Sequence, residues 1–172
     1  SMLPGPNNSI YITSWQDSVR ILTDTELKGV EKNPLISSLI TSSVYNENYY
    51  IGGLYGKGIV ITDKDLNVIK HITIESGLKN NIIWSVYTDK NSNIWIATNG
   101  GLNCLKSDKL LSLSINDENL ISAPFDIIED DEGFLWFPSS NGIMKMNKSS
   151  ILNYMENPKD TLKSIVYNER NG

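Results

Sequence analysis

Aromatic, amide and charged side chains recur in the turns of this chain, and together they could recognise a sugar. Aromatic rings stack on the apolar faces of sugars, while amide and carboxylate groups hold the hydroxyls. Nine residues of these types lie in turns that we expect on one face of the molecule: Trp15, Gln16, Asp17, Tyr55, Lys57, Asn80, Asn81, Asn99 and Asn141. Asparagine also favours turns for conformational reasons, so an ordinary turn-forming role for these residues stays open.

Catalytic and metal chemistry have less support from the residue types. The single cysteine, Cys104, lies within Leu102–Leu105 and is interpreted as a small apolar strand residue, with a reactive thiol as the alternative. The single histidine, His71, is too far along the chain from Cys104 to give a zinc spacing, and any histidine-dependent catalysis would depend on it alone. We therefore predict no catalytic residue, no metal and no cofactor.

Two further segments invite a ligand interpretation. The acidic run Glu129–Gly133 offers oxygen ligands for calcium, but its repeat partner Asp89–Asn93 is a turn without comparable charge, so we favour a solvated turn. A carboxylate pair for glycoside hydrolysis stays open, because it depends on a separation in space. The glycine-rich segment Gly52–Gly58 has strands on both sides, whereas a nucleotide-binding loop would lead into a helix.

The composition describes a globular protein with an acidic surface. Its 172 residues carry 15 basic and 20 acidic side chains, giving a net charge of -5, so no basic stripe suits nucleic acid. No apolar run approaches the roughly 18 residues that a membrane helix requires.

The elements that must position these side chains follow from an internal repeat. Trp95 and Trp136 lie 41 residues apart in matching segments, and each follows another aromatic residue, Trp84 or Phe125, by 11 positions. Taking Tyr11 and Tyr50 as the earlier equivalents gives spacings of 39, 45 and 41 residues. Periods of about 40 to 45 residues built from short strands are typical of propeller blades, each a four-stranded sheet.

Alternation and turn residues predict the strands of the two clearest copies. In the first of them we expect strands at 83–88, 94–98, 102–106 and 110–115, and in the next at 125–129, 134–139, 143–147 and 164–167. The excursion Ser149–Pro158 is expected to hold one helical turn, capped by Ser149 or Ser150. The tryptophans lie mid-strand, where we expect them to pack adjacent sheets together.

The segment 76–105 resembles the two-component regulator propeller repeat. The resemblance rests on Ser76–Tyr87, on a polar turn, and on the run Ile94–Leu102, and it extends more weakly over 125–146 and 39–77. Phe137–Ser139 and Tyr50 depart from the usual pattern. This repeat is found in the sensor regions of bacterial hybrid two-component systems and related membrane-bound regulators.

The resemblance implies an extracytoplasmic domain, periplasmic or extracellular, that senses a ligand and is anchored to the membrane through segments outside this chain. An oligosaccharide is the ligand class it suggests, and the domain itself is expected not to be an enzyme. Two alternatives stay open: a non-catalytic scaffold for dimerisation or protein interaction, and a propeller lyase or glycosidase.

The strand count gives an all-β partial propeller of about four blades, belonging to a larger propeller. We expect approximate blades at 9–36, 37–77, 78–121 and 122–172, the first of them starting at its second strand. An open arc of this kind exposes an apolar sheet face at each end, and such faces favour self-association.

Overall fold

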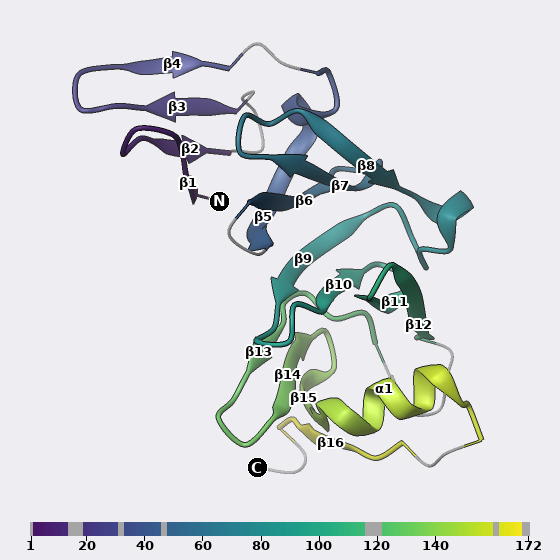
Figure 1. Ribbon diagram of the computed structural model, residues 1–172. Helices are drawn as coiled ribbons and strands as arrows, with labels where there is room; N and C mark the ends of the chain where they lie inside the picture. Colours follow the sequence, from purple (N-terminus) through teal and green to yellow (C-terminus); the bar gives the residue numbers. More distant parts are fainter. Residues whose placement is uncertain are drawn as a thin grey trace.

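The structure is a computed structural model, and it describes residues 2–13, 19–30, 33–45, 48–115, 122–159 and 162–169. Within these ranges the chain forms four antiparallel sheets, each of four strands paired in chain order. The sheets stack one on the next, from the purple N-terminal end to the yellow C-terminal end (Figure 1). The predicted all-β architecture of four-stranded repeats is confirmed.

The strands are short, as expected for this kind of repeat. The first sheet contains β1 (Met2–Pro4), β2 (Ile10–Ile12), β3 (Arg20–Leu22) and β4 (Leu27–Gly29). The second contains β5 (Leu39–Tyr45), β6 (Tyr49–Leu54), β7 (Gly58–Asp63) and β8 (Val68–Ile72). The third contains β9 (Ile83–Thr88), β10 (Ile94–Thr98), β11 (Gly101–Lys106) and β12 (Lys109–Ser114). The fourth contains β13 (Ile128–Glu129), β14 (Phe134–Ser139), β15 (Gly142–Asn147) and β16 (Ser164–Tyr167).

Helical structure is confined to connections between strands. Single 3₁₀ turns at Ile36–Ser38 and Ile74–Ser76 precede the second and third sheets, and α1 (Lys148–Glu156) links β15 to β16. The expectation for α1 was wrong in length and cap: it has nine residues, and Asn147 is its N-cap, accepting a hydrogen bond from the Ser150 N–H. The helix persists because Ile151 and Met155, one turn apart, are buried against the third and fourth sheets.

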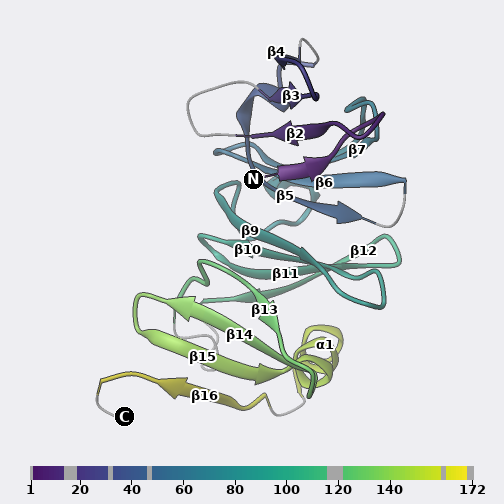
Figure 2. The same cartoon turned by 90° about the vertical axis from the view of Figure 1, so that its left-hand side faces the viewer.

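Apolar side chains fill the space between successive sheets, so the described residues form three cores rather than one. Figure 2 shows the resulting stack from the side. Leu3 and Tyr11 pack with Leu54 between the first and second sheets, and Ile51 packs with Ile94 between the second and third. The first strands of neighbouring sheets lie close together, since β1 contacts β5 and β5 contacts β9.

The first sheet is complete, which corrects the prediction that it starts at its second strand. β1 pairs with β2, placing Leu3 opposite Tyr11. The turn between the two strands has the length of the equivalent turn in the third sheet, because Leu3 lies eight residues before its partner Tyr11, as Tyr87 lies before Trp95. In that turn the Gly5 N–H donates to the Ser9 carbonyl at 2.7 Å.

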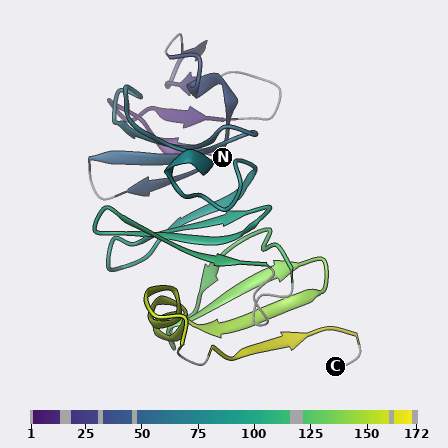
Figure 3. The ribbon, with the colours of Figure 1, turned by 90° about the vertical axis from the view of Figure 1, so that its right-hand side faces the viewer.

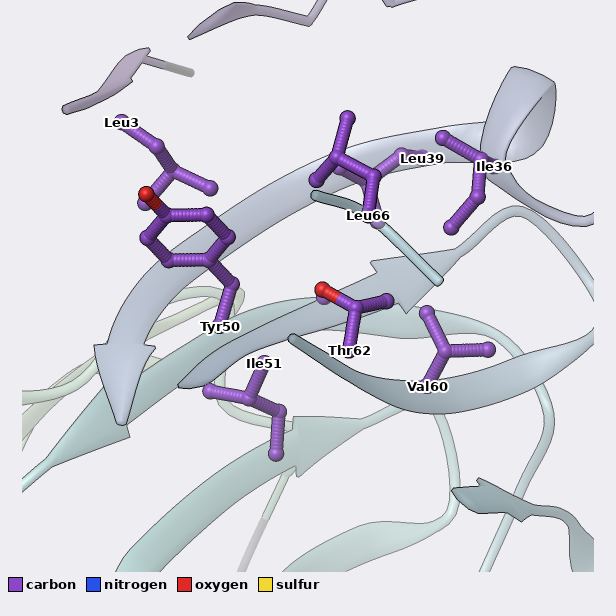
Figure 4. Close-up of a pocket in the computed structure, with 9 residues that line it drawn as sticks. Leu3, Ile36, Leu39, Tyr50, Ile51, Val60, Thr62 and Leu66 are labelled. Carbon is purple, nitrogen blue, oxygen red and sulfur yellow. The ribbon is translucent and has the colours of Figure 1, made fainter. Parts of the chain in front are cut away.

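The repeat position assigned to Tyr50 belongs to Ile51. Tyr50 faces the first sheet, where its ring meets Tyr11 edge to face at 6.2 Å, whereas Ile51 points to the opposite side of β6 (Figure 4). Leu39 lies 11 residues before Tyr50, as Trp84 lies before Trp95, but Leu39 pairs with Leu54 as Ile83 pairs with Thr98. Leu39 therefore corresponds to Ile83 and not to Trp84, and the count falls one residue short. A shift of one residue places a side chain on the other face of its strand.

The predicted strand at 125–129 shrinks to Ile128–Glu129. The Phe125 N–H still donates to the Pro138 carbonyl at 2.8 Å. Pro138 has no N–H with which to donate in return, so the ladder between the first two strands of this sheet is incomplete.

Two glycines after the second strand of their sheets have a left-handed backbone. Gly101 has φ 137° and Gly142 has φ 113°. A Cβ atom would lie 2.1 Å from the Leu113 carbonyl oxygen at Gly101 and 2.3 Å from that of Tyr167 at Gly142. Backbone conformation and close approach of the neighbouring strand therefore both require glycine at these two positions.

Candidate functional site

In the second, third and fourth sheets, the loop from the second to the third strand lies at the same end of the sheet, and so does the connection from the second sheet to the third. We call this end the loop face. It carries Tyr55 and Lys57 after β6, Asn80 and Asn81 before β9, Asn99 after β10, and Asn141 after β14. The predicted residues Trp15, Gln16 and Asp17 lie outside the described residues. Figure 3 shows these loops along one edge of the stack.

Backbone hydrogen bonds hold adjacent loops of this face together. The Tyr55 N–H donates to the Ser38 carbonyl at 3.1 Å, and the Gly58 N–H donates to the Asn81 carbonyl at 3.0 Å. The Asn99 N–H donates to the Ile82 carbonyl at 3.0 Å. The structure therefore brings the loops of the second and third sheets together.

Two of the predicted site residues are used in turns. The Asn80 Oδ1 accepts from the Ile82 N–H at 2.8 Å, and the Asn81 Oδ1 accepts from the Ile74 N–H at 2.9 Å. Both side-chain oxygens fix the path of the chain into β9, which is the turn-forming role that the sequence left open.

Three other side chains of the loop face are exposed, and a fourth, Lys57, is exposed but hydrogen-bonded. Tyr55 is 57% exposed, and Asn99 and Asn141 are also exposed. The Lys57 Nζ donates to the Ser38 Oγ at 2.9 Å, and the Lys57 carbonyl lies 2.6 Å from the His71 Nε2. An exposed phenol ring and exposed amide groups on one face can contact a polar ligand with apolar faces.

Sequence reasoning did not include two aromatic residues at the inner edge of this face. Trp84 lies at a β-bulge, because Thr98 pairs with Ile83 and Ala97 pairs with Ser85. Its ring meets Phe125 edge to face at 5.7 Å, and its buried indole N–H has no hydrogen-bond partner among the described residues. Phe125 is 45% exposed. The 11-residue spacing before Trp95 and Trp136 marked both residues, but their contact with each other depends on how the two sheets pack.

A buried polar cluster joins the third sheet to the fourth. Asp89 has a fully buried side chain, and its Oδ2 lies 3.3 Å from the Lys148 Nζ, which also pairs with Glu129. The Tyr87 hydroxyl donates to Glu129 at 3.0 Å, and burial followed by this bond raises the pKa of Tyr87 to about 12. The cluster fixes two sheets against each other and is structural.

In the hairpin before each tryptophan, an aspartate side chain accepts hydrogen bonds from the turn and from the tryptophan indole. The Asp89 Oδ1 accepts from two backbone N–H groups of its turn, and its Oδ2 accepts from the Trp95 Nε1 at 3.1 Å. Asp130 does the same for its own turn and accepts from the Trp136 Nε1 at 2.7 Å. Burial alone would raise the pKa of Asp89, but hydrogen bonds from Asn93 and Trp95 outweigh it and lower that pKa. The six-residue spacing from aspartate to tryptophan was the pattern that could have identified this role.

This arrangement accounts for the acidic run at Glu129–Gly133 without a metal. Asp130 holds the turn, and Glu129 pairs with Lys148. Across the described ranges, no three histidine, cysteine, aspartate or glutamate residues come together to hold an ion. Cys104 is fully buried, and burial raises the pKa of its thiol to about 12, as fits the apolar role predicted for it.

The two tryptophans have the same position in their sheets and different surroundings. Trp95 is fully buried in the core between the third and fourth sheets, which confirms its packing role. Trp136 lies on the opposite side of the fourth sheet from that core. It is only half-buried, with its ring stacked on Tyr167 at 5.7 Å.

Two cavities lie away from the loop face. One, of about 10 Å³, lies between the first two sheets beside Tyr50 and Thr62 (Figure 4), and a space of this size admits at most one water. The other, of about 760 Å³, lies beside the fourth sheet and the start of α1, next to Phe134, Lys145 and Lys163.

Comparison with known proteins relates this arrangement to one family of repeats. Residues 77–100 match the family model of the two component regulator propeller, which confirms the resemblance seen in the sequence: the chain carries a repeat of this kind. No curated protein matches the chain.

Solved structures show the same fold. The extracellular domain of a protein described as a hybrid two component system from B. thetaiotaomicron superposes with a TM-score of 0.78, at 19% identity, over 99% of this chain and 23% of that one. A catalytically inactive virginiamycin B lyase from Staphylococcus aureus, with quinupristin, gives 0.68 at 10% identity, over 99% of this chain and 56% of that one. A WD40 propeller domain superposes with a TM-score of 0.63 at 10% identity, over 80% of this chain and 46% of that one. The chain thus spans about a quarter of the first relative and about half of the other two.

Proposed function

We propose that this chain, which carries a two-component regulator propeller repeat, is a sensory propeller segment from the extracellular region of such a regulator. The observation that carries the proposal is the match of residues 77–100 to the repeat, within a chain that folds into four propeller-like sheets. The likeness to an extracellular domain of a hybrid two component system supports the same location. No helix among the described residues is both long and apolar enough to cross a membrane.

The loop face is the part of the molecule that suits ligand recognition. Tyr55 at 57% exposure and Phe125 at 45% offer ring surface, and Asn99 and Asn141 offer amide groups. An oligosaccharide can be bound by aromatic rings that cover the apolar faces of its sugars and by amide groups that hold its hydroxyls. Oligosaccharides are therefore the ligand class that we propose.

Calorimetric titration with a panel of neutral and acidic oligosaccharides tests this proposal. For a saccharide that binds, Tyr55→Ala should weaken the affinity by about tenfold or more, which corresponds to about 1.4 kcal/mol for a ring at the centre of a contact. Tyr49→Ala is the matched control, because Tyr49 is a 37% exposed tyrosine at the far end of the same strand. No heat with any saccharide, or equal losses in both variants, would contradict the proposal.

A lyase or glycosidase function would also place its ligand on this face. The likeness to the virginiamycin B lyase concerns the fold alone, and the proposed domain is non-catalytic. Incubating the same saccharides with the chain and analysing them for cleavage products distinguishes the two, since a sensory domain should return every saccharide unchanged.

A further inference from the structure

The charged side chains of the second and third sheets are distributed unevenly between the two ends of these sheets. At the end opposite the loop face, the segments 63–67, 89–93 and 107–108 contain four carboxylates and two lysines. These residues are Asp63, Asp65, Asp89, Asp108, Lys64 and Lys90. On the loop face, the segments 55–57, 73–82 and 99–100 contain two lysines, Lys57 and Lys79, and one carboxylate, Glu75. Positive charge therefore exceeds negative charge in these loop-face segments, although the chain as a whole has a net charge of -5.

Lys57 lies in the loop between β6 and β7, and hydrogen bonds hold this loop in place. The Gly58 N–H donates to the Asn81 carbonyl at 3.0 Å, and the His71 Nε2 lies 2.6 Å from the Lys57 carbonyl. The Lys57 Nζ donates to the Ser38 Oγ at 2.9 Å, which uses one of the three N–H groups of its ammonium. The side chain is exposed, so the other N–H groups are accessible to a ligand.

Lys79 lies in the connection to β9, beside the loop that contains Lys57. The Lys79 N–H donates to the fully buried Asn103 side chain at 3.1 Å. The Lys79 carbonyl lies against Gly100, where a Cβ atom would come within 2.5 Å of it. Asn81, which accepts from the Gly58 N–H, is two residues further along the chain, a span of at most about 7 Å. The two lysines therefore lie on neighbouring segments whose backbones are fixed.

Neither lysine is neutralised by an ion pair. No carboxylate of the described residues pairs with Lys57 or Lys79. The Glu75 carboxylate accepts a hydrogen bond from the Thr73 hydroxyl instead. Two unpaired ammonium groups on the same face as an exposed ring, that of Tyr55, suit a ligand that has both anionic groups and apolar faces.

We propose that the loop face of the second and third sheets binds an oligosaccharide with carboxylate or sulfate groups. Lys57 and Lys79 contact these anionic groups, and the Tyr55 ring stacks on a sugar. This ligand class rests on the proposed function and narrows it from oligosaccharides in general to acidic ones. Each of the two sheets that position these residues has a neighbouring sheet on both sides, so the site does not depend on the first or the last sheet.

Calorimetric titration with matched pairs of saccharides tests the ligand class. Oligogalacturonate is compared with its methyl ester, and a chondroitin sulfate oligosaccharide with its desulfated form. The acidic member of a pair should bind at least about fivefold more tightly than its partner, and higher ionic strength should weaken its binding. The pair that shows this difference distinguishes carboxylate from sulfate recognition.

The outcomes separate the ligand class from the proposed function. Binding of neutral saccharides alone, or equal binding of both members of each pair, would overturn the acidic class and leave a saccharide-binding domain. No binding of any saccharide would overturn both.

Charge variants test which side chains contact the anionic groups. Lys57→Gln and Lys79→Gln should each weaken binding of the acidic saccharide by about fivefold, as for an exposed ion pair, and leave binding of its neutral partner unchanged. Lys90→Gln removes an exposed lysine at the opposite end of the third sheet and is the matched control, which should bind as the parent chain does. Glu75→Gln should bind the acidic saccharide more tightly, because it removes a negative charge from the same face.

Circular dichroism verifies that each variant is folded. Unchanged affinity in both loop-face lysine variants, an equal loss in Lys90→Gln, or weaker binding by Glu75→Gln would each overturn the proposal.

Discussion

Replacing Asp89 with asparagine tests the contact that joins the third and fourth sheets. The Asp89 carboxylate accepts four hydrogen bonds, from the Asn91 and Asn93 backbone, the Asn93 side chain and Trp95, and it pairs with Lys148. Asparagine keeps the Oδ1 acceptor but places an NH₂ group where Oδ2 received two donors and faced the ammonium. The donors of the Asn93 side chain, Trp95 and Lys148 would then face a fourth donor, the new NH₂ group, in a site without solvent access.

The expected loss in the free energy of unfolding is about 3 kcal/mol. Breaking a buried ion pair costs about 3 to 5 kcal/mol, and a hydrogen bond to a charged group contributes about 1.5 to 3 kcal/mol. The lower end of the range for a broken ion pair applies, because Lys148 keeps Glu129 as a partner. Urea unfolding, followed by circular dichroism at a fixed protein concentration, measures the loss.

The chain provides a control in its own repeat. Asp130 holds the equivalent hairpin, but its side chain is 28% exposed, so Asp130→Asn should lose clearly less stability because water can replace the missing acceptor. Equal losses in the two variants, or a loss below about 1 kcal/mol for Asp89→Asn, would refute the reasoning.

Acid pH should remove the difference between the parent chain and Asp89→Asn. The folded chain lowers the pKa of Asp89 below its ordinary value of 3.8, so the stabilisation is present above that pH and is lost as pH falls through the folded pKa. The two unfolding curves should therefore approach each other below a pH of about 3.8. A gap that stays constant into this range would mean that the carboxylate charge is not its cause.

Two further predictions concern buried positions of the third sheet. Gly101→Ala should lower the free energy of unfolding by about 2 kcal/mol or more, because the new Cβ would meet the Leu113 carbonyl at a positive φ; Gly29→Ala, with no atom within 4 Å, should change it by less than about 0.5 kcal/mol. The Cys104 thiol, buried and with its pKa raised to about 12, should react with a thiol reagent such as 5,5′-dithiobis(2-nitrobenzoic acid) only after urea unfolds the chain, and rapid reaction of the folded chain would contradict its burial.

Strand positions followed from the sequence where turns are short and apolar residues alternate. The predicted strands at 83–88, 94–98 and 164–167 match β9, β10 and β16 residue for residue. The prediction was wrong where one residue changed the register or the pairing: Leu39 corresponds to Ile83 and not to Trp84, so the repeat position is Ile51, and Pro138 shortened β13. The missing N–H of Pro138 is visible in the sequence, but its effect, like the correspondence between Leu39 and Ile83, depends on which residues pair.

The sequence predicted which loops form the candidate site, but only partly which of their side chains are available to a ligand. Topology alone places these loops at one end of the sheets. Whether an asparagine binds a ligand or supports a turn depends on its neighbours: Asn81 is occupied by the Ile74 N–H, whereas the Asn99 side chain is exposed. The residues Trp15, Gln16 and Asp17 stay a prediction.

The amino-acid sequence by itself determined the repeat, the four-stranded unit and the family that it resembles, because these follow from alternation, turn residues and spacing along the chain. Only the tertiary structure decided that Trp95 is buried while Trp136 lies on an exposed face, and that Asp89 meets Lys148 across two sheets. The physical reason is that burial and charge pairing depend on the neighbouring sheet. Identical positions in successive repeats therefore differ in role according to whether a sheet covers them.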